Sequence, residues 1–115
     1  MGGTIAGYEG GSVASTITIA KDFSPYPAGR FCSDGPNSGE RFREEFLLPN
    51  IEQGTNTTII FNGARGYGSS FLEEAFGGLV RKGFTPELVL STFQLESSDE
   101  SLISEVEEYI KKANG

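Results

Sequence analysis

Three stretches of the chain have the residue pattern of β-strands. Over positions 15–20 two threonines alternate with two isoleucines, and this β-branched alternation predicts a half-buried strand with the isoleucines facing the core. The apolar runs at 57–61 and 88–95 predict two further strands. The intervening stretch 22–37 is rich in proline and glycine, so it is expected to form turns, with room for one short strand at 29–33.

Apolar residues recur at helical spacing in three other stretches. Ser38 is expected to cap the first helix, and Pro49 to end or kink it. The second helix is expected to start at Ser69 or Ser70, where Ser70 and Glu73 fit a capping box. Its apolar face consists of Phe71, Leu72, Ala75, Phe76, Leu79 and Val80.

The last helix is predicted to begin at a second capping box, Ser97 with Glu100. Its apolar face comprises Leu102, Ile103, Val106, Tyr109 and Ile110. The predicted order is strand, short strand, helix, strand, helix, strand, helix, which indicates an α/β domain with a mainly parallel sheet. We expect a flexible Gly-rich tail over residues 1–14 and a single domain over 15–115.

Composition narrows the classes of function. The net charge of −7 and the absence of any Lys/Arg run longer than two residues disfavour a nucleic-acid or anionic-membrane surface. The chain has no histidine, which excludes a Ser-His-Asp triad and His-ligated metals, and Cys32 is its single cysteine. We therefore expect no metal and no cofactor. Neither a signal peptide nor a membrane span is expected, so a cytoplasmic location is predicted.

A glycine-rich turn follows the strand at 57–61. Gly63 and Gly68 have the spacing of a phosphate loop, but Ser69 stands where that motif needs lysine. Gly66 and Gly68 match the first half of a dinucleotide fingerprint, but Phe71 stands at its third glycine. A nucleotide loop is therefore a weak match.

Two serines at a helix start can act as caps, as an anion site or as phosphate acceptors. One cap would explain Ser69 or Ser70 but leave the other hydroxyl free. A phosphate there would be attracted by the helix N–H groups and repelled by Glu73 and Glu74. Attraction and repulsion acting together in this way are suited to a binding surface that is switched by charge.

Three segments carry a family resemblance. They are residues 23–30, with Phe23-Ser24 and Pro27-Ala28-Gly29-Arg30, residues 38–45, and residues 66–79, the longest and most specific. Over about 15–112 the chain resembles the STAS-like domains of unknown function of bacterial and archaeal proteins. The resemblance implies an α/β STAS-like fold with a mixed, mostly parallel four-stranded sheet and about three helices.

The chain is more distantly similar to the STAS domains of anti-sigma-factor antagonists. In those proteins a kinase of the GHKL ATPase type phosphorylates a serine at the start of the second helix, and this blocks binding to the kinase. Ser69 matches that serine by position, and Ser70 adjoins it. The chain departs from the pattern at Gly68 and Asn62, where aspartate is expected.

Our first expectation is a non-catalytic, regulatory, signalling domain that binds a protein, with a GHKL-type ATPase or kinase as the partner that the resemblance implies. Phosphorylation is expected at Ser69 or Ser70. The expected binding residues are Tyr67, Gly68, Ser69, Ser70, Glu73 and Glu74. The turn-rich loop gives a secondary candidate site, with Arg30, Asp34, Ser38 and Glu40.

Two alternatives remain open from the sequence. One is a small enzyme or nucleotide-binding protein that uses the Gly-rich turn and Ser69, Asp34, Arg30, Glu40 and Glu44. Without histidine it would need a carboxylate base, with Mg²⁺ as its metal. The other is a self-assembling module, which leaves both a monomer and a homodimer open.

Overall fold

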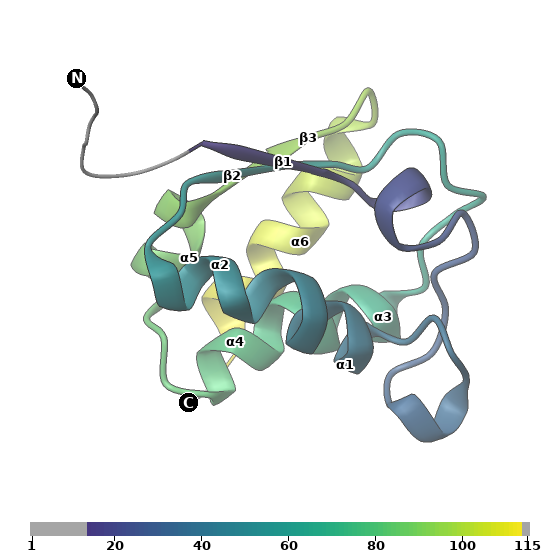
Figure 1. Ribbon diagram of the computed structural model, residues 1–115, viewed down its shortest axis with the longest axis horizontal. Helices are drawn as coiled ribbons and strands as arrows, with labels where there is room; N and C mark the ends of the chain where they lie inside the picture. The colour runs from purple at the N-terminus through teal and green to yellow at the C-terminus, as the bar shows by residue number, and fades with distance from the viewer. Residues whose placement is uncertain (1–13, 114–115) are drawn as a thin grey trace.

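The computed structural model of the protein describes residues 14–113 (Figure 1). Apart from Ala14, the predicted Gly-rich tail lies outside the described residues. The elements in chain order are β1 (Ser15–Thr18), η1 (Ile19–Phe23), η2 (Cys32–Asp34), α1 (Gly39–Phe42), η3 (Arg43–Leu47), α2 (Leu48–Gln53), β2 (Thr57–Ile60), α3 (Ser69–Leu72), η4 (Glu73–Gly77), α4 (Gly78–Arg81), α5 (Pro86–Thr92), β3 (Phe93–Glu96) and α6 (Glu100–Lys112).

Within residues 14–113 the sheet has three strands in the order β1-β2-β3, and both pairings are parallel. The α/β class and the parallel sheet are therefore confirmed, whereas the expectations of a four-stranded, mixed sheet and of about three helices are wrong. The short strand expected at 29–33 is replaced by the 3₁₀ turn η2. The Asp34 carboxylate accepts hydrogen bonds from the backbone N–H groups of Arg30 and Phe31, which folds this segment back on itself instead of extending it.

The strand predicted over 88–95 is wrong in its first half, which forms helix α5. The Thr85 hydroxyl accepts a hydrogen bond from the Leu88 N–H at 3.1 Å, and Pro86 is the first helical residue. A capping threonine followed by proline is a helix-start signal. The continuous apolar residues from Leu88 onward obscured that signal, because short apolar runs fit a strand or a buried helix equally well.

Two long helical runs, 39–53 and 69–81, each contain a central π-helical turn, η3 or η4. Ser38 caps the first run as predicted, because its hydroxyl accepts from the Arg41 N–H at 3.1 Å. Pro49 neither ends this run nor prevents α2, since it lies at the start of α2 directly after η3. Gly54 then ends the run in the left-handed conformation, with φ of 71°.

Both predicted capping boxes are wrong. The second helical run is capped by Gly68, which offers no side chain, so Ser69 and Ser70 are its first two residues. The last helix is capped by Asp99, whose carboxylate accepts hydrogen bonds from the N–H groups of Ser101 and Leu102. The predicted last helix itself is confirmed as α6, with Val106 and Ile110 buried.

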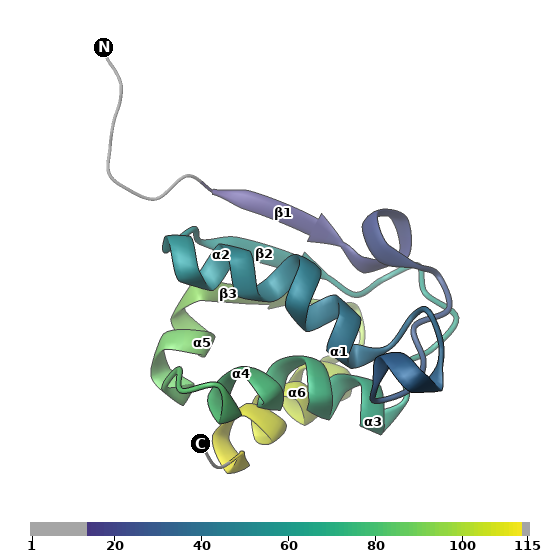
Figure 2. The same cartoon turned by 60° about the horizontal axis from the view of Figure 1, so that its bottom comes forward.

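The molecule has two layers, with the helices α1, α2, α3, α4 and α6 on one face of the sheet (Figures 1 and 2). The core between the layers contains Ile17, Ile59 and Phe93 from the strands and a cluster of phenylalanines from the two helical runs. The opposite face of the sheet is mostly polar and carries Thr16, Thr18, Thr58, Gln94 and Glu96. No helix within residues 14–113 combines the length and apolar character needed to cross a bilayer.

Candidate functional site

The start of α3 presents three consecutive exposed residues, Gly68, Ser69 and Ser70. They follow the glycine-rich turn after β2, in which Gly63 and Gly66 adopt φ of 103° and 152°, values that favour glycine. Because Gly68 provides no side-chain cap, the first N–H groups of this helical run have no side-chain acceptor from the N-cap residue. Neither serine is needed as a cap.

Tyr67 anchors this turn to the end of β2. Its hydroxyl donates a hydrogen bond to the backbone oxygen of Phe61 at 2.6 Å, and its ring packs edge-on against the Phe61 ring. Burial raises the pKa of Tyr67 to about 12. The phenol is therefore a neutral donor that fixes the turn, and it holds the two serines at the surface.

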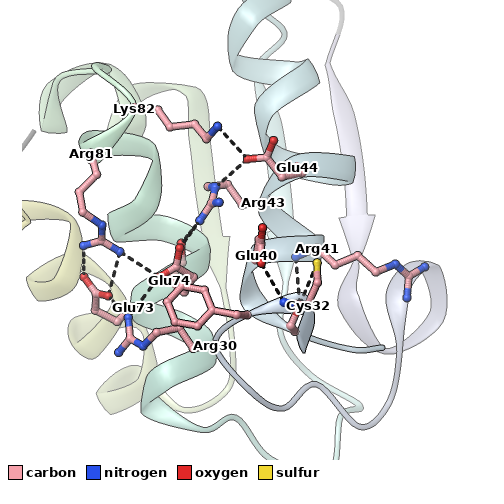
Figure 3. A network of polar contacts seen from close by, with 12 residues as sticks. Arg30, Cys32, Glu40, Arg41, Arg43, Glu44, Glu73, Glu74, Arg81 and Lys82 are labelled. Carbon is pink, nitrogen blue, oxygen red and sulfur yellow. Dashed lines mark hydrogen bonds and ion pairs between the residues drawn. The ribbon is translucent and has the colours of Figure 1, made fainter. Parts of the chain in front are cut away.

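Glu73 and Glu74 belong to a network of ion pairs (Figure 3). Glu73 lies between Arg30, at 2.6 Å, and Arg81, at 2.7 Å. The Arg81 hydrogen bond, with a further one from Arg30, holds the pKa of Glu73 below its ordinary value, although partial burial acts in the opposite direction. Glu74 is 8% exposed, and its carboxylate accepts from Arg43 at 2.6 Å. The two carboxylates expected at the binding surface are thus occupied by arginines of this chain.

Three glycines make room for this network and for the helix packing. A Cβ at Gly78 would overlap the Arg43 guanidinium, and one at Gly77 would lie 2.6 Å from the Glu73 carboxylate. A Cβ at Gly39 would overlap the backbone oxygen of Phe71. Gly77 and Gly78 therefore accommodate charged side chains of the network.

The secondary candidate loop meets the second helical run through Arg30, which bonds Glu73 and Glu74. The other loop residues have local contacts. Asp34 accepts backbone N–H groups within the loop, Glu40 accepts the Cys32 N–H at 2.8 Å, and Ser38 caps α1. Arg30 therefore joins the two candidate regions, whereas Asp34, Ser38 and Glu40 stabilise the loop against α1.

The residues of the alternative enzyme hypothesis have similar contacts. Glu44 accepts from Arg43 at 2.9 Å and from Lys82 at 3.2 Å, so it belongs to the ion-pair network. The constellation of Ser69, Asp34, Arg30, Glu40 and Glu44 is thus distributed over separate local contacts. Residues 14–113 contain no cluster of three or more Cys, Asp or Glu side chains placed to hold a metal ion.

A cavity of about 380 Å³, which was not predicted from the sequence, lies beside the glycine-rich turn. It lies where β2 and β3 end, between that turn and the start of α6. Asn62 after β2 and the Ser97-Ser98-Asp99 segment after β3 are polar residues at adjacent strand ends. That pairing was the available signal, because the carboxyl edge of a parallel sheet is where ligands bind in open α/β folds.

The fold and the site define a small two-layer α/β domain with a serine pair at the helix start after its central strand. The chain belongs to the family of STAS-like domains of unknown function (DUF4325), whose pattern matches residues 38–102. The predicted family is thus confirmed, over the range from the α1 cap into α6. No curated protein and no solved structure matches the chain in our comparisons.

Proposed function

We propose that this STAS-like domain is a non-catalytic regulatory module that binds a protein partner through the start of α3. The observation that carries this proposal is that Ser69 and Ser70 are exposed while neither serves as the helix cap. Two hydroxyls with no structural duty as caps are available to a partner or a modifying enzyme. The cytoplasmic location expected from the sequence belongs to the same proposal.

The proposed binding surface is smaller than the one expected from the sequence. It comprises Gly68, Ser69 and Ser70, with Tyr67 fixing the turn beneath them. Glu73 and Glu74 set its charge from within the domain, because both are paired with arginines. The partner in this proposal is a GHKL-type ATPase or kinase, as the resemblance to anti-sigma-factor antagonists implies.

The switch in this proposal is phosphorylation of Ser69 or Ser70. A phosphate adds nearly two negative charges at neutral pH. Arg30 and Arg81, whose guanidinium groups contact the next turn of this helical run, already pair with Glu73. The added charge would therefore stay exposed at the contact surface and weaken binding to a partner that packs closely against the helix start.

The test is affinity purification of the intact chain from its native host, with mass spectrometry of the tryptic peptide spanning 66–81 and of the proteins retained. Ser69→Glu and Ser70→Glu should each reduce retention of the partner by about tenfold, whereas the alanine variants should retain it. Ser104→Glu adds the same charge at an exposed position of α6 and is the matched control. Equal retention by all variants would overturn the proposed switch.

A further inference from the structure

The cavity beside the glycine-rich turn is lined by two segments that are distant in sequence. One wall comes from the turn and consists of Asn62, Gly63, Ala64, Gly66 and Tyr67. The other wall comes from the segment after β3 and the first turns of α6 and consists of Ser97, Ser98, Asp99, Ser101, Leu102 and Glu105. The volume of the cavity, about 380 Å³, is at the lower end of the range for small-molecule sites. A small ligand with a few non-hydrogen atoms fits this size.

The two walls are held together by Asn62. Its side-chain oxygen accepts hydrogen bonds from the Ser98 N–H at 3.0 Å, the Ser98 hydroxyl at 3.2 Å and the Ser97 hydroxyl at 3.4 Å. These contacts join the end of β2 to the turn after β3, so the cavity is preformed.

The charges of the lining select the sign of the ligand. The cavity is lined by two carboxylates, Asp99 and Glu105, and by no lysine or arginine of the described chain. Asp99 already accepts the N–H groups of Ser101 and Leu102, so the positive end of α6 has its counter-charge. These two carboxylates would repel a phosphate or carboxylate ligand. The charge of the lining therefore disfavours the phosphate site that the glycine spacing suggested.

Glu105 is held in position by a neighbour on its own helix. The Tyr109 hydroxyl donates to one of its carboxylate oxygens at 2.6 Å, and within residues 14–113 the other oxygen accepts no hydrogen bond. Phe61 and Leu102 add apolar surface to the same cavity. The site therefore combines acceptors for a charged donor with an apolar surface for a hydrocarbon stem.

We propose that this cavity binds a small organic cation, an ammonium or guanidinium group on a short aliphatic stem. The charged group bonds the Glu105 carboxylate, Asp99 adds negative charge to the same cavity, and the stem lies against Phe61 and Leu102. The serines at the start of α3 do not line this cavity. The inference does not rest on the proposed partner binding.

The test is a titration of the intact chain, with backbone amide shifts followed by NMR, using n-pentylamine and agmatine as probes and glutarate as the anionic control. The amines should shift the amides of Gly63, Gly66 and Ser98, and glutarate should not. Nα-acetyl-lysine N-methylamide presents the same ammonium from a blocked backbone. If it binds as well as the amines, the natural source is a protein side chain; if only the amines bind, the source is a free molecule. Both results support the cation site.

Glu105→Gln keeps an acceptor for Tyr109 but removes the charge, and it should weaken amine binding by about tenfold, as expected when a charged hydrogen bond is lost. Glu100→Gln makes the same change one turn away, at a residue that does not line the cavity, and should leave the affinity within about twofold. An equal loss of amine affinity in both variants would mean that the amines respond only to the overall negative charge. That result would overturn the proposal. Absence of shifts with every amine, or equal binding of glutarate, would do the same.

Discussion

The side chain of Arg43 binds Glu74 twice, donating from the same nitrogen to the backbone oxygen at 2.8 Å and to the carboxylate at 2.6 Å. This pair joins η3 to η4, and hence the two long helical runs to each other (Figure 3). Both side chains are at least nine-tenths buried. Both residues lie within residues 38–102, the range that the family pattern matches.

Removing one partner of this pair should destabilise the fold. Arg43→Leu leaves the Glu74 carboxylate buried with only its longer contacts to Arg30 and Arg81, and should lower the free energy of unfolding by about 3 kcal/mol. Urea denaturation measures this. The double variant Arg43→Leu/Glu74→Leu should recover most of the loss, because no charge is then left unpaired.

A surface ion pair provides the comparison. Lys112→Gln breaks the exposed contact between Lys112 and Glu108 on α6, and should change stability by less than about 0.5 kcal/mol. A loss of similar size in Lys112→Gln and Arg43→Leu would contradict the assignment of Arg43 to a buried network.

The three glycines at the close approaches should differ in their tolerance of alanine. At Gly39 the added methyl group meets the backbone oxygen of Phe71, which cannot move alone, so Gly39→Ala should destabilise by about 2–3 kcal/mol. At Gly77 the obstacle is the end of the flexible Glu73 side chain, and alanine also favours helix by roughly 1 kcal/mol. Gly77→Ala should therefore be nearly neutral. Thermal unfolding of both variants checks the order, and a reversed order would refute this account.

Stability should fall as the pH drops through the range in which Glu73 titrates. The pKa of Glu73 is lowered in the folded state, chiefly by the hydrogen bond from Arg81, so its contribution is fully present above the ordinary value of 4.5. It is lost as the pH falls from there through the lowered folded-state pKa. Glu73→Gln should flatten this part of the curve of unfolding free energy against pH. Glu52→Gln, at an exposed position, is the control, and an unchanged curve in Glu73→Gln would exclude this role.

The Tyr67 phenol should ionise at a higher pH than an ordinary tyrosine. Its pKa of about 12 predicts a step near pH 12 in an ultraviolet titration of the folded protein, and Tyr67→Phe should remove that step. Because the folded-state pKa is raised, the linked stability is present below pH 10 and is lost as the pH rises through 12. At neutral pH, Tyr67→Phe should cost about 1 kcal/mol, since the Phe61 backbone oxygen loses its donor. No change at either pH would mean that this hydrogen bond contributes nothing to stability.

Local signals predicted some elements correctly. Ser38 was recognised as a helix cap because serine is a preferred N-cap residue directly before a stretch with helical apolar spacing. Alternation identified β1, and the spacing of Val106 and Ile110 identified α6. Each of these elements depends on a short window of sequence, so the pattern alone determines it.

Other features depend on partners that are distant in sequence. Glu74 lies on the apolar face of its helix, between Phe71 and Gly78, and this position was the available signal that it is buried. Its ion-pair partner could not be predicted from the helix alone, because Arg43 lies in the other helical run. The cavity was missed for the same reason, since Asn62 and Glu105 line one cavity only after β2 and β3 have paired.

The parallel sheet also has a consequence for how the chain folds. Ser15 pairs with Thr57, 42 positions further along, and Thr57 in turn pairs with Phe93. Among the described residues no two strands are joined by a tight hairpin, so every strand pairing must close a long loop before it gains a hydrogen bond. The two helical runs can form their turns locally, within microseconds, whereas the sheet has to wait for collapse. We expect the central strand to be protected late in refolding, with its neighbours on both sides joining it in the same cooperative step.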